Sequence, residues 1–190
     1  MEIKILEVNK EELSEYAKIP MVFNVNSKYK LTKLNGGLGG ILLNEVTVKE
    51  YFKDMGANER PDEWPLEFDI SNWGFFIAYD DRKPVAGLTL VYNTEGVNML
   101  GKRKDISVLW DIRVAPEYKG RGIGKLLISS AKVWSTERGC KQIKIETQNN
   151  NVAACKFYAQ QGAELREIRE YAYSGDFEDE AMLIWYLDLE

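Results

Sequence analysis

Apolar and polar residues fall into short regular runs through the second half of the chain, and these runs predict β-strands. The runs at residues 73–79 and 85–92 flank the turn residues 80–84, which predicts a β-hairpin. Further strands are predicted at residues 106–114, 142–147, 163–173 and 181–189.

Two segments between these strands carry the periodicity of amphipathic helices. Residues 122–138 place apolar side chains three and four positions apart, and Gly139 is a typical helix-ending residue. A second helix is predicted at residues 152–161, ended by Gly162. The strand–helix–strand unit at residues 106–147 predicts a right-handed parallel crossover, and the whole succession predicts the α/β (α+β) class.

The first part of the chain is less regular. It predicts a strand at residues 2–8, a short helix at 11–18, a second helix at 46–55 and a turn-rich connector at 58–65. Residues 31–43 contain NGGLGG, which no Gly-Lys-Ser/Thr follows, so a plain or substrate-covering loop is favoured over a phosphate site. We see no internal repeat, and the expected organisation is one domain over residues 1–190.

Composition narrows the chemistry. The 190 residues are 45% hydrophobic, which suits one packed core, and the net charge of −5 disfavours a nucleic-acid partner. The chain has no histidine, which excludes Ser–His and Cys–His hydrolase mechanisms and leaves a carboxylate, a tyrosine or a bound water as the base. Its two cysteines make a poor zinc site, so no metal is expected. We find no signal peptide and no apolar run near the about 18 residues of a membrane helix, and we therefore expect a cytoplasmic protein without a membrane partner.

The string VAPEYKGRGIG at residues 114–124 is the strongest local signal. Its glycines stand where a predicted strand gives way to a predicted helix, whose first amide groups and partial positive charge favour anions. Lys119, Arg121 and Lys125 add positive charge, which indicates a diphosphate site. The spacing differs from nucleotide-hydrolase and dinucleotide loops, and the alternative is a glycine-rich turn that only begins a helix.

Lys119-Gly-Arg-Gly-Ile-Gly124 resembles the [Arg/Gln]-x-x-Gly-x-Gly/Ala signature of the GCN5-related N-acetyltransferases (GNAT), with lysine in the first position. Asp111-Ile-Arg-Val114 before it, and the pattern N-x-x-A-x-x-[FL]-Y-x-x-x-G at residues 151–162 after it, agree with the same family. The resemblance covers residues 73–188 and implies the GNAT fold: a mixed, mostly antiparallel sheet with splayed central parallel strands and helices on both faces. It also implies acetyl-CoA as cosubstrate, with residues 1–70 as the acceptor-side segment.

The resemblance assigns site residues. The Val114 amide would hold the thioester oxygen, Asn151 would bond the pantetheine arm, and the glycine loop would hold the diphosphate. Tyr158 would protonate the leaving thiolate; the alternative is a core tyrosine with a polar edge. The full cofactor-binding set is Ile112, Arg113, Val114, Lys119, Gly120, Arg121, Gly122, Ile123, Gly124, Lys125 and Asn151.

An amine acceptor must lose a proton, and Asp111 and Glu146 are the best-placed carboxylates in the sequence. The alternatives are structural ion pairs with Arg113 or Lys144, or a water chain that takes the proton instead.

The chain resembles the streptothricin acetyltransferases most, through residues 110–114, the stretch ETQNNN and the ending LIWYLDL. This implies direct acetylation of a primary amine of a small cationic molecule in a ternary complex, in antibiotic resistance. Acidic residues at 62–69 and 176–180, with aromatic neighbours, agree with a cation, although a solvated acidic loop explains them equally well. The alternatives are a protein or peptide N-acetyltransferase and a non-catalytic acyl-CoA-binding module. Members of the superfamily often form homodimers, and the final strand is the candidate interface.

Overall fold

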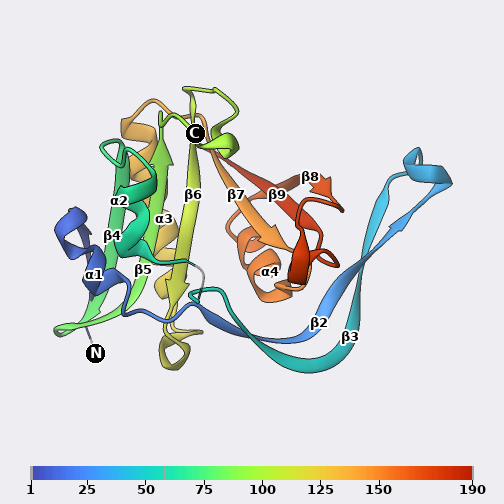
Figure 1. Cartoon of the computed structure of the whole chain (residues 1–190), viewed down its shortest axis with the longest axis horizontal. Helices are drawn as coiled ribbons and strands as arrows, with labels where there is room; N and C mark the ends of the chain where they lie inside the picture. The colour runs from blue at the N-terminus through green and yellow to red at the C-terminus, as the bar shows by residue number, and fades with distance from the viewer. Residues whose placement is uncertain (1, 58, 190) are drawn as a thin grey trace. The chain divides into compact units, whose positions relative to one another are not determined.

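The computed structural model describes residues 2–57 and 59–189, apart from the side chain of Asp176. The chain divides into two compact units (Figure 1). The first unit comprises Met1–Val22, Asp54–Ile145 and Tyr186–Glu190, and the second comprises Phe23–Lys53 and Glu146–Trp185. The prediction of one domain over residues 1–190 stays a prediction.

The strands form a seven-stranded sheet in the order β1-β4-β5-β6-β7-β9-β8. In the first unit β1 (Ile3–Val8), β4 (Trp73–Asp80), β5 (Lys83–Tyr92) and β6 (Ile106–Val114) pair antiparallel in succession. Strand β7 (Gln142–Gln148) runs parallel to β6, with Ile106–Leu109 opposite Gln142–Ile145. The predicted mixed sheet and the parallel crossover are confirmed, and the predicted bounds of β6 match the structure.

Helix α3 (Ile123–Glu137) is the crossover between β6 and β7, and Gly139 ends it with a positive φ of 73°. The helix buries one apolar side, which includes Leu127, Ala131 and Trp134. The absence of a side chain at Gly74 on β4 leaves room for Trp134, because a Cβ at Gly74 would lie 2.5 Å from the indole ring.

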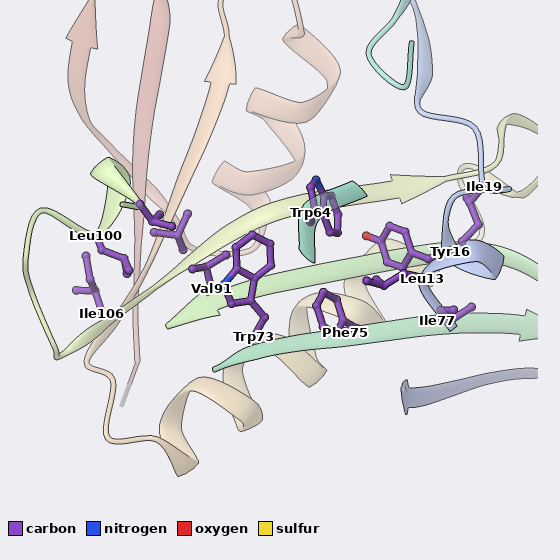
Figure 2. Close-up of a cluster of buried hydrophobic side chains, with 12 residues drawn as sticks. Leu13, Tyr16, Ile19, Trp64, Trp73, Phe75, Ile77, Val91, Leu100 and Ile106 are labelled. Atoms are coloured by element: carbon purple, nitrogen blue, oxygen red, sulfur yellow. The ribbon is translucent and has the colours of Figure 1, made fainter. Parts of the chain in front are cut away.

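The core of the first unit is rich in aromatic side chains (Figure 2). Trp64 lies at the start of the short helix α2 (Trp64–Glu67), with ring centroids 5.9 Å from Tyr16 and 5.8 Å from Trp73. Tyr16 ends helix α1 (Leu13–Tyr16) and lies against Gly87 on β5, where a Cβ would approach the phenol ring to 2.5 Å. Helices α1 and α2 are therefore held to this unit by aromatic packing, although each has only four residues.

The second unit contains a two-stranded sheet of β2 (Val22–Lys33) and β3 (Ile41–Asp54). The predicted helix at residues 46–55 is wrong, because these residues lie almost entirely within β3. Val46, Thr47 and Val48 are β-branched and favour extended backbone, and pairing with β2 decides the conformation. The predicted loop at residues 31–43 is confirmed only at its centre, since β2 extends to Lys33 and β3 starts at Ile41.

The same unit contains α4 (Val152–Gln160), β8 (Glu164–Arg169) and β9 (Met182–Asp188), although β9 continues into the first unit after Trp185. The strand predicted at residues 163–173 is shorter than expected and ends at Arg169. The predicted connector at residues 58–65 includes Asn58, which lies outside the described residues, and its remainder forms a 3-10 turn at Pro61–Glu63 that leads into α2.

Candidate active site

The glycine loop presents open backbone at the start of α3. Gly120 and Gly122 have φ values of 75° and 81°, which L-residues with side chains rarely adopt, and Gly122 is the N-cap of the helix. Leu126 is the first amide of the helix to bond back, donating to the Gly122 carbonyl at 3.2 Å. The earlier amides have no partner within the helix by its geometry, and a Cβ at either glycine would meet no atom within 4 Å. Unpaired amides at a helix start, beside glycines whose Cβ positions are open, fit an anionic group such as a diphosphate.

Three cationic side chains flank these amides. Lys119 donates a 2.6 Å hydrogen bond to the Val22 carbonyl, and partial burial lowers the pKa of its ammonium. The Arg121 guanidinium lies 5.1 Å from the centre of the Tyr118 ring, and Lys125 is exposed in the first turn of α3. Positive charge next to these amides suits an anionic group.

A β-bulge distorts β6 immediately before the loop. Thr89 of β5 lies opposite Asp111 and Leu90 lies opposite Leu109, so Trp110 is the extra residue. Bulges re-aim the side chains that follow them and occur often beside active sites. Here Asp111 and Arg113 are buried, whereas Ile112 and Val114 are half-buried.

Asp111 and Arg113 form a buried network. Arg113 Nε donates to Asp111 Oδ1 at 2.9 Å, its Nη2 pairs with Oδ2, and its Nη1 donates to the Ile19 carbonyl at 3.1 Å. The Tyr16 hydroxyl donates to Asp111 Oδ1 at 2.6 Å, and burial together with the Asp111 charge raises the pKa of Tyr16 well above its usual value. The structural ion pair that the sequence left open for Asp111 is therefore present, and both carboxylate oxygens are engaged. The backbone of Arg113, and not its buried side chain, is the part open to the predicted cofactor role.

The second unit holds the other predicted site residues. Glu146 on β7 accepts a 2.7 Å hydrogen bond from the Tyr173 hydroxyl, and burial together with Glu146 raises the pKa of that phenol. Asn151 is the N-cap of α4, where its side chain accepts from the Ala154 amide at 3.1 Å. Tyr158 on the same helix is 4% exposed, with its ring 5.3 Å from Phe157.

The predicted grouping of acidic and aromatic residues is only partly available to a ligand. Trp64 and Trp73 are buried in the core of the first unit, so their ring faces serve packing. Within residues 2–57 and 59–189, no cluster of three or more Cys, Asp or Glu side chains is arranged to hold a metal ion. In the same residues, no helix has the length and apolar character needed to cross a membrane.

One polar residue of the first unit was missed by the sequence reasoning. Glu59 is half-buried, and its Oε2 accepts a long hydrogen bond of 3.4 Å from Trp64 Nε1. Burial raises the pKa of its carboxyl group. Glu59 belongs to no recognisable motif, and the only available signal was an acid close in sequence to a large aromatic residue.

The fold and the loop together define a class: an α/β protein whose crossover helix begins at an anion site. Residues 43–163, more than half of the chain, match the Acetyltransferase (GNAT) family, and the chain belongs to that family. It is therefore an N-acetyltransferase that uses acetyl-CoA as its acetyl donor.

Individual relatives agree. The chain is 30% identical over 149 residues to a streptothricin acetyltransferase of Escherichia coli, which covers 77% of this chain and 76% of the relative. A Bacillus anthracis protein described as a streptothricin acetyltransferase, solved in complex with acetyl coenzyme A, is 27% identical with a TM-score of 0.78. That comparison covers 100% of this chain and 99% of the other. A nourseothricin acetyltransferase structure shares the fold, with a TM-score of 0.77, 23% identity and 100% coverage of both chains.

Proposed function

We propose that this enzyme acetylates a primary amine of a small cationic molecule of the streptothricin type, by direct attack in a ternary complex. The observation that carries the proposal is the 30% identity to the Escherichia coli streptothricin acetyltransferase across 77% of the chain. A thialysine N-epsilon-acetyltransferase of Sus scrofa, 36% identical over 74 residues, is a further relative whose name describes acetylation of a small amine.

The diphosphate of acetyl-CoA is proposed to bind the amides of Gly120 to Lys125. Support comes from the positive φ values of Gly120 and Gly122, from the open space that a Cβ would meet at each, and from the partial positive charge of the helix N-terminus. Lys119, Arg121 and Lys125 supply mobile charge that supports this position.

The edge of β6 is proposed to bind the pantetheine arm as an added strand. On one edge of β6, the parallel pairing with β7 covers Ile106–Leu109. On the other edge, Ile112–Val114 pair antiparallel with β5. Backbone groups at Ile112 and Val114 are thus candidates for strand addition, and the Val114 amide would stabilise the oxyanion that develops on the thioester carbonyl. Acetyl-CoA supplies a thioester, whose acyl carbon accepts an amine.

Tyr158 is proposed as the proton donor to the departing thiolate, and Asn151 as a donor to the pantetheine arm. Both assignments rest on the residues' places in the family pattern at residues 151–162. A phenol suits the role because it carries one proton in a position fixed by its ring.

A thiol-release assay tests the function. Each reaction contains the enzyme, acetyl-CoA and one candidate amine. The amines are streptothricin, aminoglycosides, polyamines and peptides with free N-termini, and the mass of each product is measured by mass spectrometry. We expect rapid thiol release with streptothricin and a product heavier by one acetyl group. Acetylation of peptides alone would favour a protein N-acetyltransferase, and binding of acetyl-CoA without thiol release from any amine would favour a non-catalytic module.

A further inference from the structure

Transfer to an amine that is protonated in water requires a group that removes the ammonium proton. The chain has no histidine, so the base is sought among carboxylates shielded from water, where a pKa can rise toward neutrality. Asp111, Glu146 and Glu59 are three carboxylates that the structure withdraws at least partly from solvent.

The contacts of these three differ. Asp111 has a guanidinium on both oxygens and a phenol on one of them, so its negative charge is fully compensated. Asp111 could take a proton only by giving up the ion pair, which would leave the buried Arg113 without its counter-ion. Glu146 accepts a 2.7 Å hydrogen bond from the Tyr173 hydroxyl, so one of its oxygens is already engaged.

Glu59 has much weaker support for its charge. Across residues 2–57 and 59–189 the structure records one hydrogen bond to it, the 3.4 Å contact from Trp64 Nε1, and no ion pair. The nearby Arg113 could pair with Glu59 only by breaking its own contacts, because its Nε and Nη2 groups bind Asp111 and its Nη1 group binds the Ile19 carbonyl.

The electrostatic surroundings act in the same direction. Burial is the largest influence and raises the pKa of Glu59, and the negative charges of Asp111 and Glu67 raise it further. The Trp64 hydrogen bond and the Arg113 charge lower it, without reversing the upward shift. A proton or a cation bound to Glu59 would therefore relieve the cost of its poorly supported negative charge.

Its position is fixed by packing. Trp64 follows Glu59 by five residues, is 4% exposed, and packs 5.9 Å from the ring of Tyr16 (Figure 2). Tyr16 in turn donates to Asp111 beside the bulge of β6. Contacts through Trp64 and Tyr16 to Asp111 therefore connect Glu59 to β6, the strand whose edge is proposed to bind the pantetheine arm.

We propose that Glu59 is the residue that accepts the proton of the acceptor ammonium, an assignment that rests on the proposed function. The ammonium N–H bond breaks and its proton passes to Glu59 Oε, which leaves a neutral amine. The amine nitrogen then forms a C–N bond to the acyl carbon as the C–S bond breaks. Tyr158 gives its proton to the departing sulfur, which leaves as a thiol, and Tyr158 takes the remaining surplus proton of the nitrogen in return. The proton on Glu59 leaves to water.

The test compares Glu59→Gln with Glu164→Gln, which makes the same change on an exposed glutamate of β8 that pairs with Arg166 at 3.1 Å. With the amine identified in the thiol-release assay, kcat/KM is measured from acid to alkaline pH. We expect Glu59→Gln to lower kcat/KM by about 10²-fold or more and to remove the fall in rate at acid pH. Glu164→Gln should keep both, and acetyl-CoA affinity should be unchanged in each variant.

Stability separates catalysis from a structural role. Since the pKa of Glu59 is raised in the folded state, deprotonation costs the folded protein more than the unfolded chain, and this cost grows as pH rises through the folded pKa. Glu59→Gln should therefore unfold at the same or a higher urea concentration than wild type at pH 8. A loss of stability that accounts for the lost activity would overturn the proposal, as would retained kcat/KM with the acid limb intact. If wild type acetylates no amine, the proposed function fails instead.

Discussion

The hydroxyl of Tyr16 donates a 2.6 Å hydrogen bond to Oδ1 of Asp111, a residue 95 positions further along the chain. This bond joins the short helix α1 to β6 just after the bulge, and Arg113 completes the network from the same strand. The network fixes the segment of β6 that leads into the glycine loop, so the proposed cofactor strand depends on residues near the N-terminus.

Replacing Asp111 should chiefly destabilise the fold. Asp111→Asn leaves the buried Arg113 without its counter-ion, and we expect the free energy of unfolding to fall by about 3–5 kcal/mol. Tyr16→Phe keeps the ring on Gly87 and removes one hydrogen bond to a charged group, so it should cost about 1.5–3 kcal/mol. Urea unfolding followed by tryptophan fluorescence measures both. An Asp111→Asn protein of wild-type stability that has lost activity would instead assign Asp111 to the chemistry.

The glycine loop can be tested with a matched pair. Gly122→Ala should weaken acetyl-CoA binding, because a methyl group on the N-cap enters the open space before the helix amides and a φ of 81° strains any L-residue. Gly139→Ala has the same kind of strain at the other end of α3, with a φ of 73° and an equally open site. Each change should cost about 1–2 kcal/mol of stability.

Isothermal titration calorimetry with acetyl-CoA then separates strain from binding. The dissociation constant of Gly139→Ala should match wild type, whereas that of Gly122→Ala should rise by about tenfold or more, the equivalent of losing one charge-assisted hydrogen bond. Equal affinities in the two variants would contradict the placement of the diphosphate at this helix start.

The regular second half of the chain was predictable because its central strands are almost continuous buried runs and its long helix buries one apolar side. Ile106–Val114 and the helix at residues 122–138 show the apolar spacing that a sheet and an overlying helix impose, and the structure places both close to the predicted bounds. The glycine positions of the loop were visible for a similar reason, since a positive φ admits few other residues.

Other features depend on contacts that spacing does not encode. Strand β3 lies in a two-stranded sheet and buries only Lys53, so its sequence shows no one-sided apolar pattern. The significance of Glu59 arises from the burial of Trp64 and from the pairing of Arg113 with Asp111. Both contacts join residues close in sequence, but the burial that gives them weight comes from tertiary packing, which the spacing does not reveal. The burial of Trp64 and Trp73 likewise follows from tertiary packing, whereas the sequence grouped them with exposed acids.

Asn151 has a structural duty that must be separated from its proposed contact with the pantetheine arm. Asn151→Ala removes the side-chain acceptor for the Ala154 amide and should cost about 1 kcal/mol as a lost helix cap. Asn151→Ser keeps a capping oxygen but shortens the side chain, so it should retain stability while raising the KM for acetyl-CoA. If Asn151→Ser has wild-type KM, the residue serves only as a cap.

Tyr158→Phe tests the proton donor. Removing the hydroxyl should lower kcat by about 10²-fold, because the thiolate would then leave without a proton from the enzyme. The KM for the amine and the affinity for acetyl-CoA should change little, since the ring remains in its buried place on α4. Rapid-mixing measurement of thiol release is needed, so that a slow chemical step is distinguished from slow product release.

The loss of kcat must also be separated from an effect on packing. The neighbouring Phe157→Leu serves as the control, because it alters the ring contact 5.3 Å away without touching a hydroxyl. If Tyr158→Phe keeps wild-type kcat, or if Phe157→Leu lowers kcat as much, Tyr158 is a packing residue and the thiolate takes its proton from water.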